Sequence, residues 1–294
     1  MKSNHSVDEY KKHVKQMLVG RFKDRAMAES IGGNFIPFGL IMRDLMLQYG
    51  LESGSAVLDI GCGSGRLANA LKEMPSLKYI GIDVVKELLE YASTLCGRED
   101  WRFYMSTDFT VPVQDNSIDM VTAFSVFTHL LHEETFVYLY EARRVLKPGG
   151  KIIFSFLDFK IPAHWAVFRS NIRHIHKRTH LNQFMDEGAV STWCEHLKLN
   201  IIDILPGNEK KIVLRQPVTL ENGIVESEFA SLGQSICVLE KPRTEEGNAP
   251  YINTPPDFDP ELYLKANPDV EEAGVDALEH FLIHGQFEGR KLKP

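Results

Sequence analysis

Short apolar runs alternate with longer amphipathic stretches between about residues 50 and 160. The apolar runs predict buried strands, and the stretches between them, with apolar residues at helical spacing, predict helices. The predicted strands are 57–60, 77–83, 101–105, 118–124 and 151–156, and the predicted helices are 67–73, 86–95 and 133–146. Strands that alternate with helices predict an α/β fold with a doubly wound, mostly parallel sheet.

The pattern continues on both sides of this region. Residues 7–29 and 37–48 are amphipathic, with Gly32 and Gly33 as a break between them, and predict two N-terminal helices. After the fifth strand, the pattern predicts a helix at about 182–197. Two further apolar runs, 200–205 and 234–240, are the candidates for the last two strands.

The first strand ends in an acid and a glycine turn, Asp59-Ile60-Gly61-Cys62-Gly63-Ser64-Gly65. Glycines allow the backbone to approach a ligand closely, and the N-terminus of the next helix offers N–H groups to polar atoms. A dinucleotide fingerprint, G-x-G-x-x-G, would place its third glycine where this chain has Arg66. An acid before the turn would repel a pyrophosphate, so the pattern favours a ligand that carries an ammonium group.

This stretch resembles motif I of the class I S-adenosylmethionine-dependent methyltransferases. The resemblance implies a Rossmann-like, seven-stranded sheet with one late antiparallel strand, and S-adenosyl-L-methionine as the cofactor. It also implies cofactor contacts from the motif, namely from Asp59, Gly61, Gly63 and Gly65.

Later positions extend the resemblance. Asp83 ends the second strand, where a carboxylate accepts hydrogen bonds from ribose hydroxyls, and Val84 follows it. In the resembling family an acid after the third strand receives the adenine amino group, and Asp108 and Phe109 match that place; the alternative is that Asp108 caps a turn. Ser125, after the fourth strand, is expected to face the donor methyl group.

The same region indicates the kind of acceptor. An Asn-Pro-Pro-Tyr type motif, which accompanies amine methylation of nucleic acid in this superfamily, is absent from residues 124–127. A hydroxyl acceptor needs a base. The candidate catalytic residues are His129, then His132, then His180; His129 could instead pack or cap the following helix.

Residues 160–180 contain five Lys or Arg and four His, with no Asp or Glu. This basic insert is suited to phosphate or another anion, although a solvated basic helix is an equal alternative. His174, His176 and His180 are not interleaved with Cys or carboxylates, and His174 and His176 lie on different faces of a helix, so no metal site is predicted.

Composition limits the function classes. The 294 residues, 44% hydrophobic and 25% charged, are typical of a globular protein, and the net charge of −7 argues against a nucleic-acid partner. Four scattered cysteines favour reduced thiols. No signal peptide and no membrane span of roughly 20 apolar residues is present, so we expect a cytoplasmic protein.

The C-terminal part is separate. Residues 242–256 are polar and proline-rich, as linkers are. Residues 257–294 resemble a small helical module attached to bacterial glycan-biosynthesis proteins, including glycosyltransferases, which suggests docking to a partner of that kind; the alternative is a brace on the catalytic domain. We therefore expect N-terminal helices over the cofactor site at 1–50 and a methyltransferase domain at 51–241, with its substrate insert and helix at 160–199.

Together these features predict an S-adenosylmethionine-dependent O-methyltransferase of bacterial surface polysaccharide biosynthesis. Its substrate would be a sugar hydroxyl of a glycan or of a nucleotide-linked or lipid-linked sugar. Two other hypotheses stay open: O- or N-methylation of a small metabolite, and a non-catalytic S-adenosylmethionine-binding scaffold of a glycan-assembly complex.

Overall fold

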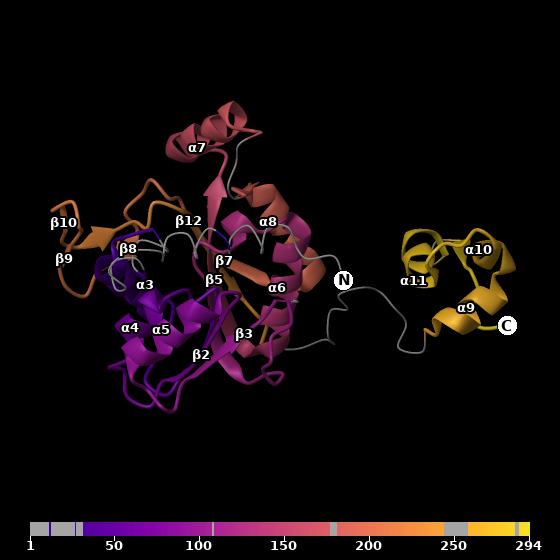
Figure 1. Ribbon diagram of the computed structural model, residues 1–294, viewed down its shortest axis with the longest axis horizontal. Coiled ribbons are helices and arrows are strands. Elements are labelled where there is room, and N and C mark those ends of the chain that lie inside the picture. The colour runs from indigo at the N-terminus through magenta and orange to yellow at the C-terminus, as the bar shows by residue number, and fades with distance from the viewer. Residues whose placement is uncertain are drawn as a thin grey trace. The chain divides into compact units, whose positions relative to one another are not determined.

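The computed structural model describes residues 12, 27, 32–107, 109–176, 181–243, 258–285 and 288–294 of the chain (Figure 1). The chain divides into two compact units, Met1–Glu246 and Gly247–Pro294. The predicted helix at 7–29, apart from Lys12 and Met27, and most of the predicted linker lie outside the described residues.

A twisted sheet forms the centre of the first unit (Figure 1). Its strand order is β3-β2-β1-β4-β5-β12-β7, and a short strand, β6, pairs with the end of β5. The bounds of these strands are β1 Ala56–Ile60, β2 Lys78–Asp83, β3 Arg102–Met105, β4 Ile118–Ala123, β5 Leu146–Asp158, β6 Phe184–Met185, β7 Asn200–Leu205 and β12 Ser235–Glu240. β12 is antiparallel to both neighbours, and the pairs from β3 to β5 are parallel. The predicted doubly wound sheet with one late antiparallel strand is confirmed.

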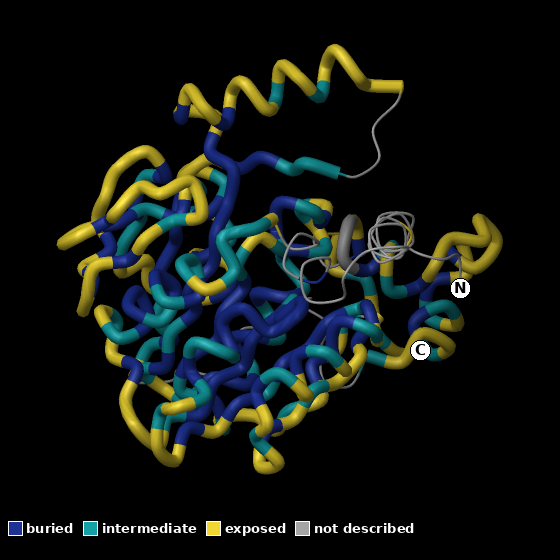
Figure 2. The backbone as a smooth tube through the Cα atoms, turned by 60° about the vertical axis from the view of Figure 1, so that its left-hand side comes forward, coloured by how far each residue is buried: buried dark blue, intermediate teal, exposed yellow. Residues whose placement is uncertain are grey.

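Helices cover both faces of the sheet. Their bounds are α3 Phe35–Gln48, α4 Arg66–Leu71, α5 Lys86–Cys96, α6 His132–Val145, α7 Pro162–Arg173 and α8 Glu187–Leu197. Alternate residues of β1 point to opposite faces. Leu58 packs in a core with α6 and α8, whereas Val57 packs in a second core with α3 and α4. In Figure 2 the centre of this unit is largely dark blue, the colour of buried residues.

Two elements begin five residues away from their predicted start, and the other described boundaries differ by two residues or fewer. The predicted helix at 182–197 is wrong at its start, because residues 184–185 pair with β5 as β6 and α8 begins at Glu187. Asp186 fixes that start by accepting a hydrogen bond from the N–H of Ala189 at 3.0 Å. β5 begins at Leu146 rather than at 151, with a register shift against β4 near Met120.

The segment between β7 and β12 folds over α3. It contains two small antiparallel ribbons made by β8 Ile212–Val213, β9 Val218–Thr219, β10 Val225–Glu226 and β11 Phe229–Ala230. The buried carboxylate of Asp44 on α3 accepts from the N–H of Arg215 at 2.9 Å, and Gln48 accepts from the N–H of Val213 at 3.0 Å. These bonds hold α3 and the ribbons together at one side of the sheet's carboxyl edge.

The second unit has a core of its own. Its helices are α9 Pro260–Ala266, α10 Pro268–Glu272 and α11 Ala277–His280, followed by a π-helical turn Phe281–Gly285. Tyr263 is fully buried among Val270, Ala277 and Phe281, and its hydroxyl is 2.9 Å from Nδ1 of His280. In the described part of the chain, no helix has the length and apolar character needed to cross a membrane.

Candidate active site

The glycine turn joins β1 to α4. Gly61, Gly63 and Gly65 all have positive φ angles, of 67°, 54° and 86°. A Cβ on Gly61 would collide with the side chain of Val126, and one on Gly65 would lie 2.8 Å from Cβ of Ala92. Both conformation and close packing therefore require glycine at these places.

Asp83 ties the end of β2 to this turn. Its carboxylate accepts from the backbone N–H of Gly63 and of Val85, each at 2.9 Å. Burial raises the pKa of Asp83 to about 6, although hydrogen bonds from these N–H groups and from that of Val84 act in the opposite direction. The carboxylate is thus fixed at the carboxyl end of β2, where it can receive further donors.

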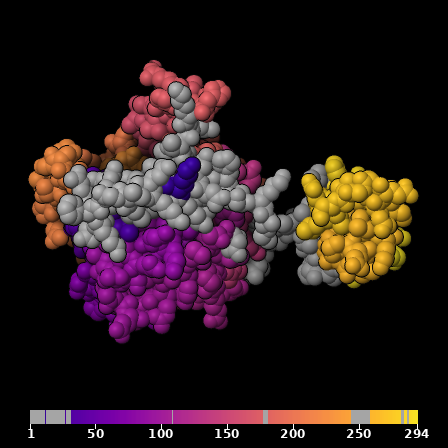
Figure 3. All heavy atoms as spheres, in the orientation of Figure 1, coloured from indigo at the N-terminus to yellow at the C-terminus, as the bar shows by residue number. Residues whose placement is uncertain are grey.

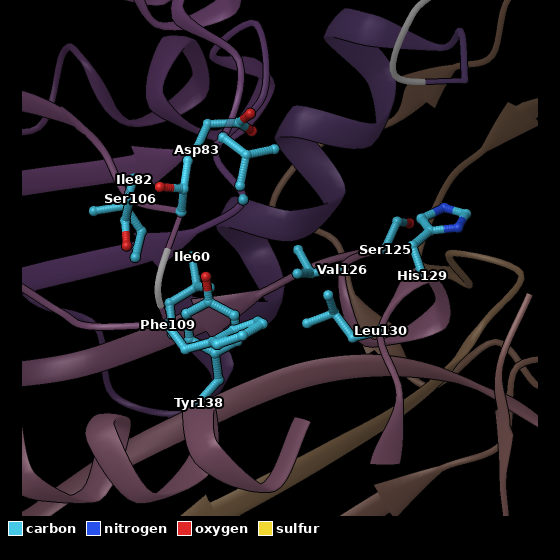
Figure 4. Close-up of a pocket in the computed structure, with 13 residues that line it drawn as sticks. Ile60, Ile82, Asp83, Ser106, Phe109, Ser125, Val126, His129, Leu130 and Tyr138 are labelled. Atoms are coloured by element: carbon cyan, nitrogen blue, oxygen red, sulfur yellow. The ribbon is translucent and has the colours of Figure 1, made fainter. Parts of the chain in front are cut away.

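A pocket opens at this edge of the sheet. Figure 4 shows Asp83 and Ser106 toward one side of it, and Ser125 and His129 toward the other. Phe109 and Tyr138 meet edge to face, with ring centroids 5.5 Å apart, and form an apolar wall between these sides. The mixture of apolar walls with a few polar groups suits a ligand that, like a nucleoside, has an apolar ring and polar hydroxyls.

The predicted cofactor residues divide into two groups. Gly61, Asp83, Val84, Phe109 and Ser125 line the pocket. Asp59, Gly63 and Gly65 are outside its lining, and Asp108 lies outside the described residues. Tyr138, which comes from α6, was not predicted to line the pocket, because nothing in a helical pattern marks one aromatic residue as facing a ligand.

Asp59 is directed away from the pocket lining. Its carboxylate accepts from the hydroxyl of Tyr79 at 2.6 Å and from the hydroxyl of Thr122 at 2.9 Å. Burial raises the pKa of Asp59 to about 6, against the effect of these two hydrogen bonds. The acid thereby joins β1, β2 and β4 just below the glycine turn.

His129 is in the 3₁₀ turn Phe127–His129 after β4 and lines the pocket. Its Nδ1 is 2.7 Å from the carbonyl oxygen of Leu181. A carbonyl oxygen can only accept, so Nδ1 carries hydrogen and Nε2 of the neutral ring is the proton-accepting nitrogen. This tautomer is the one that a general base at Nε2 requires.

The two other predicted histidines are placed differently. Nε2 of His132 is 3.0 Å from the carbonyl oxygen of Phe184 and 2.9 Å from Nε2 of Gln183, and its ring meets that of Trp193 edge to face. His132 thus joins α6 to the segment around β6 and is not in the pocket lining. His180 lies outside the described residues.

A second pocket adjoins the first and shares Ser125 with it. Phe38 and Met42 of α3, Phe124 after β4 and Leu232 before β12 give it apolar walls. Its polar lining comes from Arg66, Ser125, Ser155 and Gln234. Sequence reasoning missed this pocket, because its residues come from five separate parts of the chain.

Ser125 lines both pockets. It is exposed and has a φ angle of 57°, which is unusual for a residue with a side chain. Such strained conformations concentrate at functional sites, where the surrounding structure enforces them. The two pockets therefore meet at Ser125, the residue that is predicted to face the donor methyl group.

Comparison with known proteins identifies the central part of the chain. Residues 58–154 match the family model of the methyltransferase domain. They are a methyltransferase domain. The match begins in β1 and ends in β5, so it contains the glycine turn, Asp83 and His129.

Relatives agree with this domain assignment. A ubiquinone biosynthesis O-methyltransferase of Xanthomonas oryzae is 27% identical over 162 residues, which cover 52% of this chain and 65% of that protein. The chain spans 41–66% of the length of the curated relatives that it matches.

Solved structures share the fold. A methyltransferase of Methanosarcina mazei described as S-adenosylmethionine-dependent aligns with a TM-score of 0.50 and 16% identity, over 67% of this chain and 97% of that one. A chain in the complex of the Haloferax volcanii Trm112 methyltransferase activator with a methyltransferase aligns with a TM-score of 0.56 and 18% identity, over 79% and 98%.

The residues of the methyltransferase domain fit its cofactor, S-adenosyl-L-methionine. With the cofactor bound, the Asp83 carboxylate would accept from the ribose hydroxyls, and the apolar wall of Phe109 and Tyr138 would pack on the adenine ring. Of the glycine turn, Gly61 lines the pocket, so its backbone would lie beside a bound cofactor. Ser125 lies at the opposite side of the pocket from Asp83. Among the described residues, no group of three or more His, Cys, Asp or Glu side chains is arranged to hold a metal ion.

Proposed function

We propose that the chain transfers a methyl group from S-adenosylmethionine to a hydroxyl group. The observation that carries the proposal is the position and tautomer of His129, a pocket-lining residue whose Nδ1 is bonded to the carbonyl of Leu181. An alcohol is a weak nucleophile until its proton begins to leave, and Nε2 of His129 is the group that can take this proton.

The chain's own residues have three tasks in this reaction. When bound, S-adenosylmethionine supplies a methyl group on a sulfonium, which an oxygen nucleophile displaces in line. The residues around Ser125 hold the acceptor beside that methyl group, because alignment contributes much of the rate of such a displacement. His129 receives the hydroxyl proton at Nε2, and the apolar lining of both pockets excludes water.

We further propose that the acceptor hydroxyl belongs to a sugar of a surface glycan precursor and occupies the second pocket. The rings of Phe38 and Phe124 offer apolar faces for the C–H face of a sugar, and Ser155 and Gln234 offer hydrogen-bonding groups for its hydroxyls. The resemblance of residues 257–294 to a module of glycan-biosynthesis proteins supports this acceptor class and suggests a partner of the same machinery.

A small phenolic or quinol-like acceptor is the second candidate. Phe38, Met42, Phe124 and Leu232 make the second pocket largely apolar. Several relatives are named ubiquinone biosynthesis O-methyltransferases. An aromatic acceptor related to ubiquinone would fit these apolar walls. Activity on free phenols after deletion of residues 250–294 would favour this candidate over the glycan.

The first test is calorimetric titration of the purified chain with S-adenosylmethionine, S-adenosylhomocysteine and NADH. We expect binding of the two sulfur ligands and its loss in Asp83→Ala, because the ribose acceptor is removed. Binding of NADH instead would contradict the cofactor assignment. The glycine turn would then be a dinucleotide-binding turn.

The second test is methyl transfer to glycan precursor fractions and to simple phenols. We expect His129→Ala to lower kcat by about 10²–10⁴-fold, the usual contribution of a general base, with cofactor affinity retained. His196→Ala, an exposed residue of α8, is the matched control. Cofactor binding with no turnover on any acceptor would favour the non-catalytic scaffold instead.

A further inference from the structure

Among the described helices of the first unit, α7 has the fewest buried residues. His164 is its only buried residue, and Figure 2 shows the helix as a largely exposed coil above the buried strands. In Figure 3 its atoms, in red, project from the top of this unit. A helix with so little buried surface normally carries a polar sequence all round.

The sequence of α7 is instead amphipathic. Trp165, Phe168 and Ile172 are spaced three and four residues apart, so they lie on one face of the helix, and Ile175 follows in the next turn. The side chains of Trp165, Ile172 and Ile175 are 44%, 56% and 55% exposed. A contiguous apolar stripe of this kind marks a surface that another apolar phase covers.

Cations flank the stripe. Arg169 and Arg173 follow the stripe residues Phe168 and Ile172, and both are exposed. In the described part of the chain, no carboxylate pairs with either guanidinium, whereas Lys160 pairs with Glu187 at 3.4 Å. Because residues 160–180 contain no Asp or Glu in a chain of net charge −7, this surface is locally opposite in sign to the whole molecule.

α7 is anchored in its outward position. Nε2 of His164 is 2.7 Å from the carbonyl oxygen of Gly233, and its Nδ1 accepts from the N–H of Asp158 at 2.9 Å. The rings of Phe159, Phe168 and Phe184 pack together at the base of the helix, with centroids 5.2–5.4 Å apart. The exposed stripe is therefore a fixed feature of the fold.

We propose that α7 docks the protein on an anionic lipid membrane. Trp165, Ile172 and Ile175 enter the boundary between headgroups and acyl chains, and Arg169 and Arg173 contact lipid phosphates. A tryptophan and aliphatic side chains flanked by arginines are the composition of helices that lie in a membrane interface. Anionic lipid attracts each such cation by about 1 kcal/mol. A neutral lipid surface does not provide this attraction.

A second copy of the chain fits this surface less well. In a symmetric dimer built on α7, the same face meets itself, and the arginines of both copies come together with no described acid on the helix to offset them. An anionic membrane provides both an apolar layer for the stripe and phosphate groups for the arginines.

Docking would orient the site. After α7, the N–H of Gln183 donates to the carbonyl of Thr128 at 2.7 Å, and the carbonyl of Leu181 holds His129. The helix and the proposed base are thus linked through one short segment. This consequence rests on the proposed function: a lipid-linked acceptor could reach the second pocket without leaving the membrane surface.

The test is co-sedimentation of the full chain with vesicles. One set contains equal parts of phosphatidylcholine and phosphatidylglycerol, and the other contains phosphatidylcholine alone. We expect binding to the anionic vesicles that weakens at high salt, with a blue shift of tryptophan fluorescence that Trp165→Phe abolishes. Binding to phosphatidylcholine alone should be at least about tenfold weaker, because the cations lack a partner.

Two variants and a control examine the surface itself. Arg169→Glu with Arg173→Glu, and Ile172→Ser with Ile175→Ser, should each reduce vesicle binding about tenfold or more. Ile224→Ser with Val225→Ser changes equally exposed apolar residues at the start of β10 and should bind like the wild type. Cofactor titration of every variant checks the fold separately from membrane binding.

Three results would overturn the proposal. The first is no binding of the wild-type chain to anionic vesicles. The second is unchanged binding in both α7 variants. The third is a concentration-dependent dimer of the wild-type chain that does not bind vesicles and that the Ile172→Ser/Ile175→Ser variant cannot form. The apolar stripe would then contact a second copy of the chain. Failure of methyl transfer alone leaves these readouts unaffected.

Discussion

The backbone N–H of Ser125 donates a hydrogen bond to Oγ of Ser155 at 2.7 Å. The same Oγ donates to Oε1 of Gln234 at 2.6 Å, so one hydroxyl joins the end of β4, the strand β5 and the loop before β12. Ser125 has a positive φ angle and is the residue common to both pockets. The bond to Ser155 therefore holds a strained residue at the meeting point of the two pockets.

Ser155→Ala tests this relationship. Removing the hydroxyl leaves a part-buried N–H and a carboxamide oxygen without that partner, so we expect a loss of stability of about 1–3 kcal/mol. We also expect a larger rise in the acceptor KM than in the dissociation constant for S-adenosylmethionine, because Ser155 lines only the second pocket. Urea unfolding and steady-state kinetics measure the two effects, with Ser93→Ala on the exposed face of α5 as the control. Equal effects on both ligands would contradict the assignment of the second pocket to the acceptor.

Gly61→Ala should weaken cofactor binding by tenfold or more. The new Cβ would collide with Val126, a pocket residue, and alanine at a φ angle of 67° adds roughly 1 kcal/mol of strain. The double variant Gly61→Ala/Val126→Ala should recover part of the affinity, since the second change removes the colliding methyl group. Gly223→Ala has a similar φ angle in open space and measures the strain alone. No recovery in the double variant would show that the collision with Val126 is unimportant.

Asp59→Asn should change how stability depends on pH. Burial raises the pKa of Asp59 to about 6 from the model-compound value of 3.8, so the folded state holds a proton that the unfolded state releases between these pH values. The stability that this group contributes is present below about pH 4 and is lost as the pH rises through 6. Asparagine does not ionise, and it can still bond to Tyr79 and Thr122.

The stability of Asp59→Asn relative to wild type should therefore rise between pH 4 and pH 7, by on the order of 2–3 kcal/mol. Urea unfolding of the ligand-free proteins at the two pH values measures the difference. Asp119→Asn, which changes a partly exposed carboxylate paired with Lys147, gives the reference for an acid without this burial. A relative stability that stays constant with pH would contradict the raised pKa.

Gly285→Ala should unfold the second unit and leave the first intact. A Cβ at this position would overlap the hydroxyl of Tyr263, the buried centre of that unit's core. We expect faster hydrogen exchange and proteolysis within residues 258–294, and unchanged binding of S-adenosylmethionine, because every described pocket residue lies in the first unit. Gly274→Ala has a φ angle of 65° in open space and should show only a small effect. A loss of cofactor affinity in Gly285→Ala would show that the two units depend on each other.

Much of the sheet could be predicted because its signals are local. The apolar run 118–124 and the run 234–240 each have the length and β-branched or apolar composition of a buried strand, and they became β4 and β12. The start of α8 was misplaced because Phe184 and Met185 fit an apolar helical pattern equally well, and only pairing with the end of β5 makes them a strand.

The site was predictable in part for a similar reason. Asp83 and Gly61 are fixed by their place at strand ends, and both line the pocket. Asp59 has an equally suggestive place, yet its carboxylate is held by Tyr79 and Thr122, residues that are 20 and 63 positions away in the chain. No local sequence pattern indicates which distant hydroxyl groups will donate hydrogen bonds to a buried carboxylate.

The sequence by itself determined the order of strands and helices, the glycine turn and the class of cofactor, because periodicity and the conformational freedom of glycine act within a few residues. Only the tertiary structure decided which histidine lines the pocket, where a second pocket lies and which helix stays uncovered. Those features depend on side chains such as His129 and Leu181, or Ser125 and Gln234, that meet only when β4, β5 and the segments after them pack at one edge of the sheet.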